Sequence, residues 1–472
     1  MDGVNPRYDF GSPLPALDEL GRVHFVAIGG AGMSGVATIM LERGLPVSGS
    51  DAKSSPVLDA LRHGGADVHV GHDARHIDGV DTVVVSSAVR DDNVELATAR
   101  ERGLRVLHRA QALAVTMAGS RRVAVAGASG KTTTTSMLAV SLTAAGVDPS
   151  YAGGGEIVQL GGNAHWGAGG VFVAEADESD GTFLLLYPTL AVATNIDLEH
   201  MDFYKDLDEI KAAFLNFLNK VPFFGVVILC IDNANLQGLI PLLKRRYMTY
   251  GLSRQADLRA DNLRQDGFGS RFKVIYKGYE LGEVHLATPG KHNVVNALAA
   301  IGVAIELDIP FATVQRALED FQGIQRRFQL KCDTGIKVVD DYGHHPTEIR
   351  ATLSAIRGID KGRVIVAFQP HRYTRTKALF EEFVTSFNDA DVLIVTEIYA
   401  ASEEKIEDVS GERLAERIHT SGHKHVIYAP TKEDVVRVIE EMAQPGDVVV
   451  TLGAGDIYKV GETLCERWRG EG

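Results

Sequence analysis

The sequence has few cysteines, the residues that form disulfides and thiolate zinc sites. Only three cysteines, Cys230, Cys332 and Cys465, occur in 472 residues, and no two of them form a C-x-x-C pair. This spacing argues against a disulfide framework and against a thiolate zinc site. We therefore expect a protein of a reducing compartment, the cytoplasm.

Long apolar runs are also missing. No hydrophobic stretch approaches the roughly 20 residues that cross a bilayer. The first twenty residues carry Asp2, Asp9, Asp18 and Glu19 instead of an apolar segment behind a basic start. We predict neither a membrane span nor a secretory signal.

Positive charge is in deficit, with 48 Lys and Arg against 62 Asp and Glu and a net charge of −14. Nucleic-acid binding requires clustered cations, so the excess of negative charge argues against a nucleic-acid-binding protein. A local phosphate pocket is compatible with this excess. Hydrophobic residues make up 45% and charged residues 23% of the chain, which is typical of a folded protein. Its length suits about three domains.

What the sequence contains is a repeated α/β pattern. Apolar runs meet a glycine or polar loop and then a helical pattern, in three successive segments. The runs lie at 23–28, 82–85, 105–107, 122–126, 170–174, 190–194, 225–229, 338–339, 363–367, 392–395 and 447–450. Nearly continuous Val, Ile and Ala runs favour parallel strands buried on both faces. We predict a Rossmann-like domain over 1–118, a central P-loop ATPase-like domain with a mostly parallel sheet over 119–325, and a second Rossmann-like domain over 326–472.

The first motif is Gly30-Ala31-Gly32-Met33-Ser34-Gly35, which follows a strand directly and precedes a helical pattern. With Asp51 about twenty residues further on, it matches the dinucleotide fingerprint, in which glycines let the backbone approach a diphosphate at a helix N-terminus. NAD and a nucleotide-sugar share that diphosphate, so the motif indicates a class of ligand only. A tight turn that binds nothing is the simpler alternative.

The second motif is Gly127-Ala128-Ser129-Gly130-Lys131-Thr132-Thr133, again between a strand and a helix. Such a turn directs N–H donors at phosphate oxygens, Lys131 supplies a cation near the transferring phosphoryl group, and Thr132 can ligate magnesium. A standard Walker A motif has glycine at the position of Val125, so this is a shorter variant. A solvated lysine at a Thr-rich helix start is the alternative.

A run of carboxylates, Glu175 to Asp180, follows the strand predicted at 170–174, and His200 follows the next one. Ligands gather at strand ends in open α/β sheets, and hard oxygen ligands suit magnesium. We expect Glu175 to bind magnesium and His200 to be a possible ligand of a second metal ion. The alternatives are a solvated acidic turn and a structural histidine.

Polar residues also mark the start of a late helix and the strand ends of the third domain. Asn293 and Asn296 lie one turn apart and can face one ligand, or else cap the helix. The strand-end loops Asp340-Asp341-Tyr342-Gly343-His344-His345-Pro346 and His371-Arg372-Tyr373-Thr374-Arg375 carry groups able to meet a carboxylate or a phosphate. Zinc is disfavoured because a third ligand lacks the usual spacing.

Taken together and in order, these motifs resemble those of the Mur ligase family over nearly the whole chain. The residues that carry the resemblance are Gly-Gly-Ala-Gly-Met-Ser-Gly at 29–35, Gly-Lys-Thr-Thr-Thr-Thr at 130–135, Glu-Ala-Asp-Glu-Ser-Asp at 175–180, Glu-His-Met-Asp at 199–202, His-Asn-Val-Val-Asn-Ala at 292–297 and Asp-Tyr-Gly-His-His-Pro at 341–346. Six ordered motifs across three domains make coincidence implausible.

The resemblance implies an ATP- and Mg²⁺-dependent ligase of peptidoglycan precursor synthesis. In that reaction ATP phosphorylates the carboxylate of UDP-N-acetylmuramate, and the amine of L-alanine attacks the acyl phosphate. The partners implied are these small molecules, with no nucleic acid and no membrane, for a monomer or weak homodimer. The first domain would bind the UDP-sugar, the second ATP, and the third would bind the amino acid and close over the site.

The resemblance also implies roles for individual residues. Lys131 and Arg327 would hold the γ-phosphate, and Thr132, Glu175 and His200 the metal. Asn293, Asn296 and Tyr342 would meet ATP on its adenine side, and Asp341 would also contact ATP. His344, Arg372 and Arg375 would hold the muramoyl carboxylate or the amino acid, and Gly30, Ala31, Gly32, Met33, Ser34, Asp51 and Ser86 the UDP group.

Three positions, in two places, depart from the family pattern. Ala128 and Ser129 stand where this kind of ligase commonly has Thr-His, and Leu215 stands where several relatives carry a carbamylated lysine. We therefore predict no carbamate. Ligases that add alanine and ligases that recycle a tripeptide resemble each other in lacking that lysine. The Glu-Ser-Asp and Glu-His-Met-Asp motifs favour a ligase that adds alanine.

Two readings from other classes stay open. An NAD-dependent oxidoreductase built on the first domain would explain the stretch from Gly30 to Asp51 and nothing beyond Gly127. A P-loop binding protein without catalysis would explain the phosphate loops, but it would leave the carboxylates and the third-domain histidines without a role.

Overall fold

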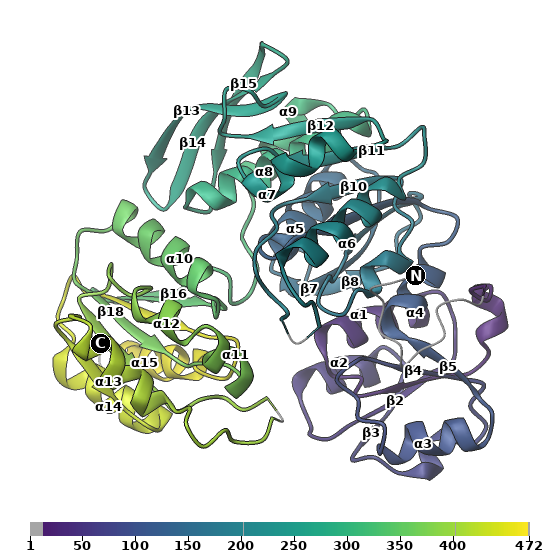
Figure 1. Ribbon diagram of the computed structural model, residues 1–472, viewed down its shortest axis with the longest axis horizontal. Coiled ribbons are helices and arrows are strands. Elements are labelled where there is room, and N and C mark those ends of the chain that lie inside the picture. The colour runs from purple at the N-terminus through teal and green to yellow at the C-terminus, as the bar shows by residue number, and fades with distance from the viewer. Residues whose placement is uncertain (1–12, 202, 402, 471–472) are drawn as a thin grey trace. The chain divides into compact units, whose positions relative to one another are not determined.

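A computed structural model describes residues 13–201, 203–401 and 403–470. The chain forms two compact units (Figure 1). The first contains the residues up to Leu263 with Phe272–His285 and Val294–Phe321, and the second contains Arg264–Arg271, Leu286–Asn293 and the residues from Gln322 onward. Three sheets with mostly parallel strands run through them, which confirms the predicted three-domain α/β fold.

The first sheet, coloured purple to blue in Figure 1, has five parallel strands in the order β3-β2-β1-β4-β5. The reversal of strand order beside β1 is the topological switch point at which α/β folds bind ligands. The strands are β1 (Val23–Val26), β2 (Val47–Asp51), β3 (Asp67–Val70), β4 (Thr82–Val85) and β5 (Arg105–His108). The helices are α1 (Ala31–Glu42), α2 (Pro56–His63), α3 (Val94–Glu101) and α4 (Arg109–Thr116), with short 3-10 turns at Leu17–Leu20 and Ala74–Ile77.

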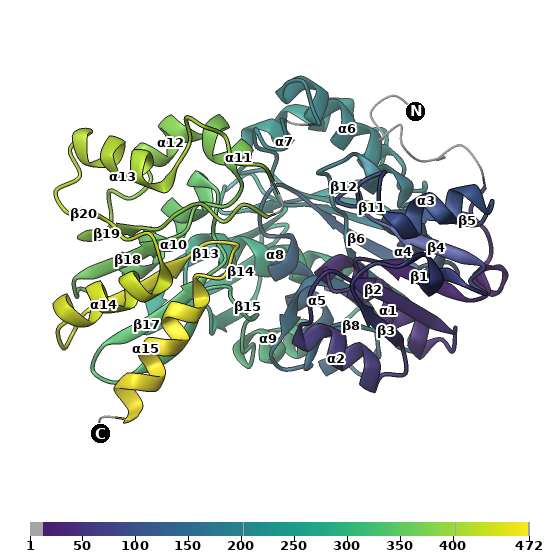
Figure 2. The same cartoon turned by 90° about the horizontal axis from the view of Figure 1, so that it is seen from below.

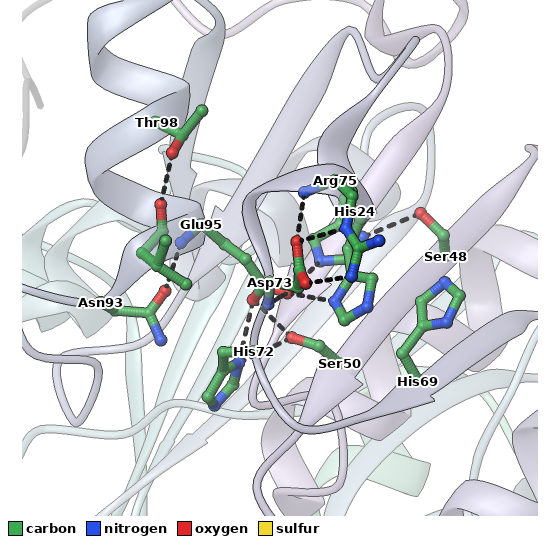
Figure 3. Close-up of polar contacts among 12 residues, drawn as sticks. His24, Ser48, Ser50, His69, His72, Asp73, Arg75, Asn93, Glu95 and Thr98 are labelled. Atoms are coloured by element: carbon green, nitrogen blue, oxygen red, sulfur yellow. Dashed lines mark hydrogen bonds and ion pairs between the residues drawn. The ribbon is translucent and has the colours of Figure 1, made fainter.

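One face of this sheet packs on α3 through an apolar core that includes Val26, Val83 and Leu96. Beside that core lies a fully buried carboxylate, Glu95, at the start of α3 (Figure 3). Its oxygens lie 2.5 Å from the Ser50 hydroxyl, 2.9 Å from His72 Nδ1 and 2.8 Å from His76 Nδ1. A buried charge is stable only when it is paired and hydrogen-bonded, so Glu95 fastens α3 to β2 and to the loop after β3.

The second sheet, largely teal in Figure 1, has ten strands in the order β15-β14-β13-β12-β11-β10-β6-β9-β7-β8. They are β6 (Arg121–Ala126), β7 (Ser150–Ile157), β8 (Gly162–His165), β9 (Val171–Glu175), β10 (Leu190–Ala193), β11 (Val226–Cys230), β12 (Tyr247–Gly251), β13 (Leu258–Asp266), β14 (Gly269–Tyr276) and β15 (Tyr279–Leu286). The helices are α5 (Lys131–Ala144), α6 (Leu207–Asn219), α7 (Ala234–Leu239), α8 (Lys291–Glu306) and α9 (Phe311–Glu319), with 3-10 turns at Thr182–Leu185 and Ile240–Leu242. The buried strands β6, β9, β10 and β11 are parallel neighbours, whereas β7 and β8 pair antiparallel.

The third sheet has six strands in the order β16-β17-β21-β18-β19-β20, with only the edge pair β16 and β17 antiparallel among the pairs described. The strands are β16 (Gln329–Asp333), β17 (Lys337–Asp341), β18 (Val364–Phe368), β19 (Val392–Val395), β20 (Val426–Tyr428) and β21 (Val448–Leu452). The helices are α10 (Pro346–Ile359), α11 (Tyr373–Ala378), α12 (Phe380–Val384), α13 (Gly411–Thr420), α14 (Lys432–Met442) and α15 (Tyr458–Gly470).

Alternate residues of these strands supply two separate cores. Val364, Val366 and Phe368 pack with α10, α12 and α13, while Ile365 and Ala367 pack with α14 and α15. The latter two helices lie side by side in Figure 2. Side chains alternate between the two faces of the sheet, and both faces are buried, as the unbroken apolar runs indicate.

The structure corrects one expectation from the sequence. Cys332 on β16 and Cys465 on α15 form a disulfide, with their Cα atoms 5.9 Å apart, and Cys230 is free and buried. The 133 residues between the two cysteines conceal this pairing in the sequence, because the last helix returns against the first strand of its own domain. The prediction on membrane spans agrees with the structure: within the described residues no helix is both long and apolar enough to cross a bilayer.

Candidate active site

The P-loop connects β6 to α5, and the side chain of one asparagine is hydrogen-bonded to its backbone. Asn195 accepts a hydrogen bond from the Ser129 N–H (2.9 Å) and donates one to the Ser129 carbonyl (2.8 Å). A Cβ on Gly127 would lie 2.0 Å from Thr194 Oγ1, and one on Gly130 would lie 2.5 Å from Asn296 Oδ1. Both glycines have positive φ, 145° and 87°. Larger residues are therefore excluded at both positions, and the loop is held in one shape.

Lys131, the first residue of α5, is the central cation of this region. Its Nζ donates to Glu178 Oε1 (2.8 Å), to Glu178 Oε2 (3.0 Å) and to the Gly127 carbonyl (2.6 Å). Burial lowers the pKa of Lys131, but the negative charges of Glu178 and Asp177 outweigh burial and raise the pKa above its usual value. The lysine is thus charged at every physiological pH and is held by a carboxylate that a phosphate could replace.

Glu178 joins Lys131 to a candidate metal site. Ligand atoms of Glu178, Glu199 and His200 lie within 4.8 Å of one another, the one such group of His, Cys, Asp and Glu among the described residues. Burial lowers the pKa of His200, yet its hydrogen bond to Glu178 and the nearby carboxylate charges raise the pKa overall. Two carboxylates and an imidazole are a donor set that divalent cations accept.

The structure places the other two predicted metal ligands together at β7. Glu175 accepts a hydrogen bond from the Gly154 N–H (2.8 Å), and a Cβ on Gly154 would lie 2.9 Å from Glu175 and 3.2 Å from Thr132 Oγ1. Thr132 and Glu175 therefore face one point on the strand. The candidate metal group that contains His200 includes Glu178 and Glu199 but not Glu175.

The glycine-rich loop of the first domain lies where β1 meets α1. Gly29 donates its N–H to Asp51 (2.9 Å), so the acidic residue of the fingerprint fixes the start of the loop. The Ala31 carbonyl accepts a hydrogen bond from Asn163 of the central domain (2.9 Å). Met33 and Ser34, in the first turn of α1, are buried, and both donate their backbone N–H to the Gly30 carbonyl. Ser86 begins the turn after β4.

In the second unit, several predicted residues gather around Glu348 on α10. The Arg327 guanidinium lies 3.8 Å from Glu348 and over the Tyr342 ring, and the His344 N–H donates to Glu348 (3.1 Å). His344 also lies beside His371, whose Nδ1 is 3.1 Å from Arg375. The backbone is left-handed at Arg326 and Phe328, with φ of 63° and 47°, on either side of Arg327. Strain of this kind persists only where the surroundings enforce it, and it is common at functional sites.

Burial alters the charges of this group. It lowers the pKa of His344 to about 4 and that of His371 to about 3, so both rings are neutral at neutral pH. Arg372 has a left-handed backbone, with φ of 68°, and its Nε is buried with no hydrogen-bond partner among the described residues. A buried guanidinium N–H gains from a hydrogen-bond acceptor, so Arg372 suits an anionic ligand.

Two predicted ATP contacts already have internal roles. Asp341 accepts hydrogen bonds from the N–H groups of Phe328 (2.8 Å) and Gly343 (2.7 Å), and burial raises its pKa to about 6. Asn293, the third residue of α8, donates its side-chain N–H to the Pro289 carbonyl (2.7 Å), whereas an N-cap residue accepts from the backbone N–H groups of the first turn. Asn296, in contrast, lies against Gly130 of the P-loop.

Sequence reasoning missed four residues that the geometry brings into the site region: Arg109, Glu178, Asn195 and Glu199. Glu178 and Glu199 stand inside motifs already singled out, and Asn195 directly follows the strand predicted at 190–194, so the strand-end location of all three is a usable signal. Arg109 had none, because it lies at the start of a helix in a different domain from its partner Asp177.

Comparison with known proteins finds three domain models of one family. The Mur ligase family catalytic domain matches residues 22–121, the Mur ligase middle domain matches 125–304, and the Mur ligase glutamate ligase domain matches 326–455. Together they cover most of the chain and follow its three sheets in order.

Individual relatives agree with the domain models. The chain is 52% identical over 451 residues to UDP-N-acetylmuramate–L-alanine ligase of Geotalea uraniireducens (strain Rf4), with 95% of this chain and 98% of the relative covered. The crystal structure of UDP-N-acetylmuramate-alanine ligase from Thermotoga maritima matches with a TM-score of 0.82 and 29% identity, over 96% of this chain and 100% of that one. A murein peptide ligase from Psychrobacter arcticus matches with a TM-score of 0.72 and 26% identity, over 95% and 98%.

Proposed function

Because this chain belongs to the Mur ligase family, we propose that it is an ATP-dependent ligase that joins L-alanine to the carboxylate of UDP-N-acetylmuramate. The observation that carries this conclusion is the 52% identity, over almost the full length of both chains, to a ligase named for that reaction. The product is a precursor of peptidoglycan. The oxidoreductase reading fails, because the family models extend through all three domains rather than the first alone.

The tripeptide-recycling ligase is the weaker alternative within the family. The murein peptide ligase structure from Psychrobacter arcticus has a TM-score of 0.72, against 0.82 for the alanine ligase structure. Relatives named for the addition of L-alanine reach 50% identity or more over 94–96% of this chain.

The reaction needs an activated acyl group, because a carboxylate is a poor electrophile. The carboxylate oxygen of UDP-N-acetylmuramate attacks the γ-phosphorus of ATP, and ADP leaves. The amine of L-alanine then attacks the acyl phosphate, the tetrahedral intermediate expels inorganic phosphate, and the amine nitrogen loses its proton. Catalysis of such a phosphoryl transfer rests on positioning and on neutralising charge.

In this scheme Lys131 and the backbone amides of the P-loop hold the phosphates of ATP. The P-loop residues are Gly127, Ala128, Ser129, Gly130, Thr132 and Thr133. Lys131 is charged and hydrogen-bonded to Glu178, so it would exchange one anionic partner for another when ATP binds. Asn296 lies against Gly130 and is the asparagine of α8 that suits a contact with ATP. Arg327, beside Tyr342, is assigned to the γ-phosphate from the C-terminal domain.

The residues present fit a magnesium ion. Thr132, Glu175 and His200 are assigned as ligands, and the neighbourhood of His200 adds the carboxylates of Glu178 and Glu199. When bound, Mg²⁺ would neutralise the negative charge of the nucleotide phosphates. Oxygen-rich donors of this kind suit magnesium better than a softer metal does.

For the acceptor substrates, the glycine-rich loop of Gly30 to Ser34 with Asp51 and Ser86 is assigned to the UDP group. His344, Arg372 and Arg375 are assigned to the muramoyl carboxylate or to L-alanine. The neutral state of His344 leaves the positive charge there to the arginines, and the unpaired Nε of Arg372 supports an anionic ligand. We further propose a cytoplasmic location and a monomer or weak homodimer.

The test is release of inorganic phosphate by the purified protein with ATP and Mg²⁺. Release is expected only when UDP-N-acetylmuramate and L-alanine are both present. Release that requires the L-alanyl-γ-D-glutamyl tripeptide in place of L-alanine would favour the recycling ligase, and release indifferent to the nucleotide-sugar would overturn the proposal.

A further inference from the structure

Arg109, the first residue of α4, lies between the glycine-rich loop and the carboxylate run of the central domain. Its Nη2 donates to Asp177 Oδ2 at 2.8 Å, and its side chain is largely buried. On the other side, a Cβ on Gly32 would fall 2.4 Å from Arg109 Nη1 and 3.1 Å from its Cδ. The guanidinium therefore rests directly against the second glycine of the loop.

A second contact holds the other end of the same carboxylate run. The Ser87 hydroxyl donates to the Asp180 carboxylate, and His108 Nε2 lies 3.5 Å from Asp180 Oδ2. The first domain thus contacts both ends of the carboxylate run: Arg109 binds Asp177, and Ser87 and His108 lie against Asp180. Glu178, the carboxylate that holds Lys131 by two hydrogen bonds, lies between these two anchored positions.

The chemistry of Arg109 suits the ligand assigned to the adjacent loop. A guanidinium offers five N–H donors in a planar fork that matches phosphate oxygens, and it never loses its charge. A diphosphate that enters at Gly32 competes with Asp177 for this fork. In the structure Arg109 Nη2 donates to Asp177 Oδ2, so Asp177 and the diphosphate are alternative anionic partners of the same guanidinium.

We propose that Arg109 is a positioning residue that couples the nucleotide-sugar site to the P-loop. When the diphosphate draws Arg109 away from Asp177, the run from Asp177 to Asp180 loses one of its anchors, and Glu178 yields Lys131 to the γ-phosphate of ATP. The inference rests on the proposed function, because it assigns the diphosphate to the Gly30–Ser34 loop. Its consequence is that ATP binds more tightly, with Lys131 directed at its γ-phosphate, when the acceptor is present.

Such a coupling is a free energy shared by two sites, and it is reciprocal. Bound UDP-N-acetylmuramate should therefore tighten the binding of a non-hydrolysable ATP analogue, by on the order of tenfold, within the usual range of coupling. The ATP analogue should tighten UDP-N-acetylmuramate binding by the same factor.

The decisive variant is Asp177→Asn, which keeps Arg109 and its guanidinium but removes the charge that it pairs with. Calorimetry should give an ATP-analogue Kd that no longer depends on UDP-N-acetylmuramate, while the affinity for UDP-N-acetylmuramate itself is retained or improved. Arg109→Ala should lose the coupling and also weaken UDP-N-acetylmuramate binding, and Arg109→Lys should restore part of the binding but not the coupling.

Arg43→Ala is the matched control. Arg43 also extends from the first domain to the central one, where its guanidinium lies 4.2 Å from the centre of the Trp166 ring, and it has no part in the carboxylate run. This variant should keep the wild-type coupling factor. A loss of coupling in Arg43→Ala equal to that in Asp177→Asn would mean that any damage to the domain contact has the same effect, and would overturn the proposal.

The inference and the proposed function fail in different ways. If the wild-type protein releases phosphate with UDP-N-acetylmuramate and L-alanine, but Asp177→Asn keeps the full coupling factor, the role of Arg109 is wrong and the function stands. If the wild-type protein shows no such reaction, the function itself is wrong.

Discussion

At the scale of single residues, the P-loop cation is prepared by a carboxylate rather than by the loop alone. Glu178 is nearly completely buried and uses both oxygens on Lys131. A buried pair of this kind costs desolvation, which is recovered only when the partners stay together or are replaced by a ligand of like charge. The geometry therefore suits a site in which a phosphate takes the place of Glu178.

We expect Lys131→Ala to lower kcat by about 10²- to 10³-fold, because a preorganised charge that stabilises the transition state is lost. Calorimetry should show UDP-N-acetylmuramate binding close to that of the wild type, since the lysine belongs to the ATP side. Lys244→Ala, at an exposed lysine of the same domain, is the control and should leave both quantities unchanged. Loss of UDP-N-acetylmuramate affinity in Lys131→Ala would reverse the assignment of the two loops.

The metal assignment is tested by magnesium titration of three variants. Glu199→Gln and His200→Ala should raise the Mg²⁺ concentration at half-maximal activity, because both side chains belong to the one candidate cluster. Glu175→Gln should raise it as well if Glu175 reaches the same ion. An unchanged titration in Glu175→Gln, with a shifted one in Glu199→Gln, would limit Glu175 to its hydrogen bond with Gly154.

At this scale the sequence predicts the role of a residue well where the residue belongs to a motif. It predicts the role poorly where a contact between distant segments of the fold decides it. The P-loop glycines and Lys131 follow from spacing, because few residue types tolerate that turn. Glu178, Asn195 and Glu199 share loops with predicted residues, but spacing does not say which carboxylate of a run points at Lys131. Arg109 meets Asp177 across 68 residues of sequence, a contact that only the fold creates.

At the scale of elements, the polar cluster beneath α3 makes the first domain sensitive to acid. Burial raises the pKa of Glu95, but hydrogen bonds from His24, Ser50 and His76 lower it to about 2, against about 4.5 for a free glutamate. Because the folded-state pKa is the lower one, this carboxylate stabilises the fold above pH 4.5. The contribution is lost as the pH falls from there toward 2.

We expect Glu95→Gln to lower the free energy of unfolding by on the order of 3 kcal/mol near neutral pH, as the shift in pKa implies. Urea unfolding at several pH values should show this difference shrinking between pH 4.5 and 2. The control is Glu101→Gln, at an exposed position on the same helix. A difference between wild type and Glu95→Gln that stays constant with pH would show that packing, and not the charge of Glu95, provides the stability.

The disulfide ties the edge strand β16 to the final helix α15. Lys331 and Glu462 form an ion pair (3.3 Å) between the same two elements, so the strand and the helix keep a non-covalent contact when the bond is open. We expect reduction to lower the free energy of unfolding of this domain by about 2–4 kcal/mol without unfolding it at 25 °C. Thermal melts with and without a phosphine reductant measure this effect.

The double variant Cys332→Ala with Cys465→Ala is the control, and its melting temperature should not respond to the reductant. Cys230→Ala, at the free buried cysteine, should respond as the wild type does. A wild-type protein whose melting temperature ignores the reductant would contradict the expected contribution of the bond.

Strands were the most predictable elements. The apolar runs at 122–126, 190–194 and 392–395 correspond to β6, β10 and β19, because burial on both faces leaves no polar position in the pattern. Strands with exposed faces, such as β7 and β13, lack that signature and were not predicted. The pairing of Cys332 with Cys465 depends on the return of α15, which no local pattern indicates.

At the scale of the whole molecule, the order of the motifs carried more information than any one of them. The stretch from Gly30 to Asp51 alone is compatible with a nicotinamide enzyme, and the P-loop alone with any nucleotide-binding protein. Their succession, with the strand-end histidines and arginines of the third sheet, is explained by a ligase that activates a carboxylate with ATP. The match of three Mur ligase domain models in the same order supports that interpretation.

The measurement that tests the central claim most directly is phosphate release with UDP-N-acetylmuramate, ATP and Mg²⁺ across a panel of amino acids and the L-alanyl-γ-D-glutamyl tripeptide. We predict the highest kcat/KM with L-alanine, lower values with glycine and L-serine, and no release when the nucleotide-sugar is omitted. Release that proceeds without UDP-N-acetylmuramate, or that requires the tripeptide, would contradict the account.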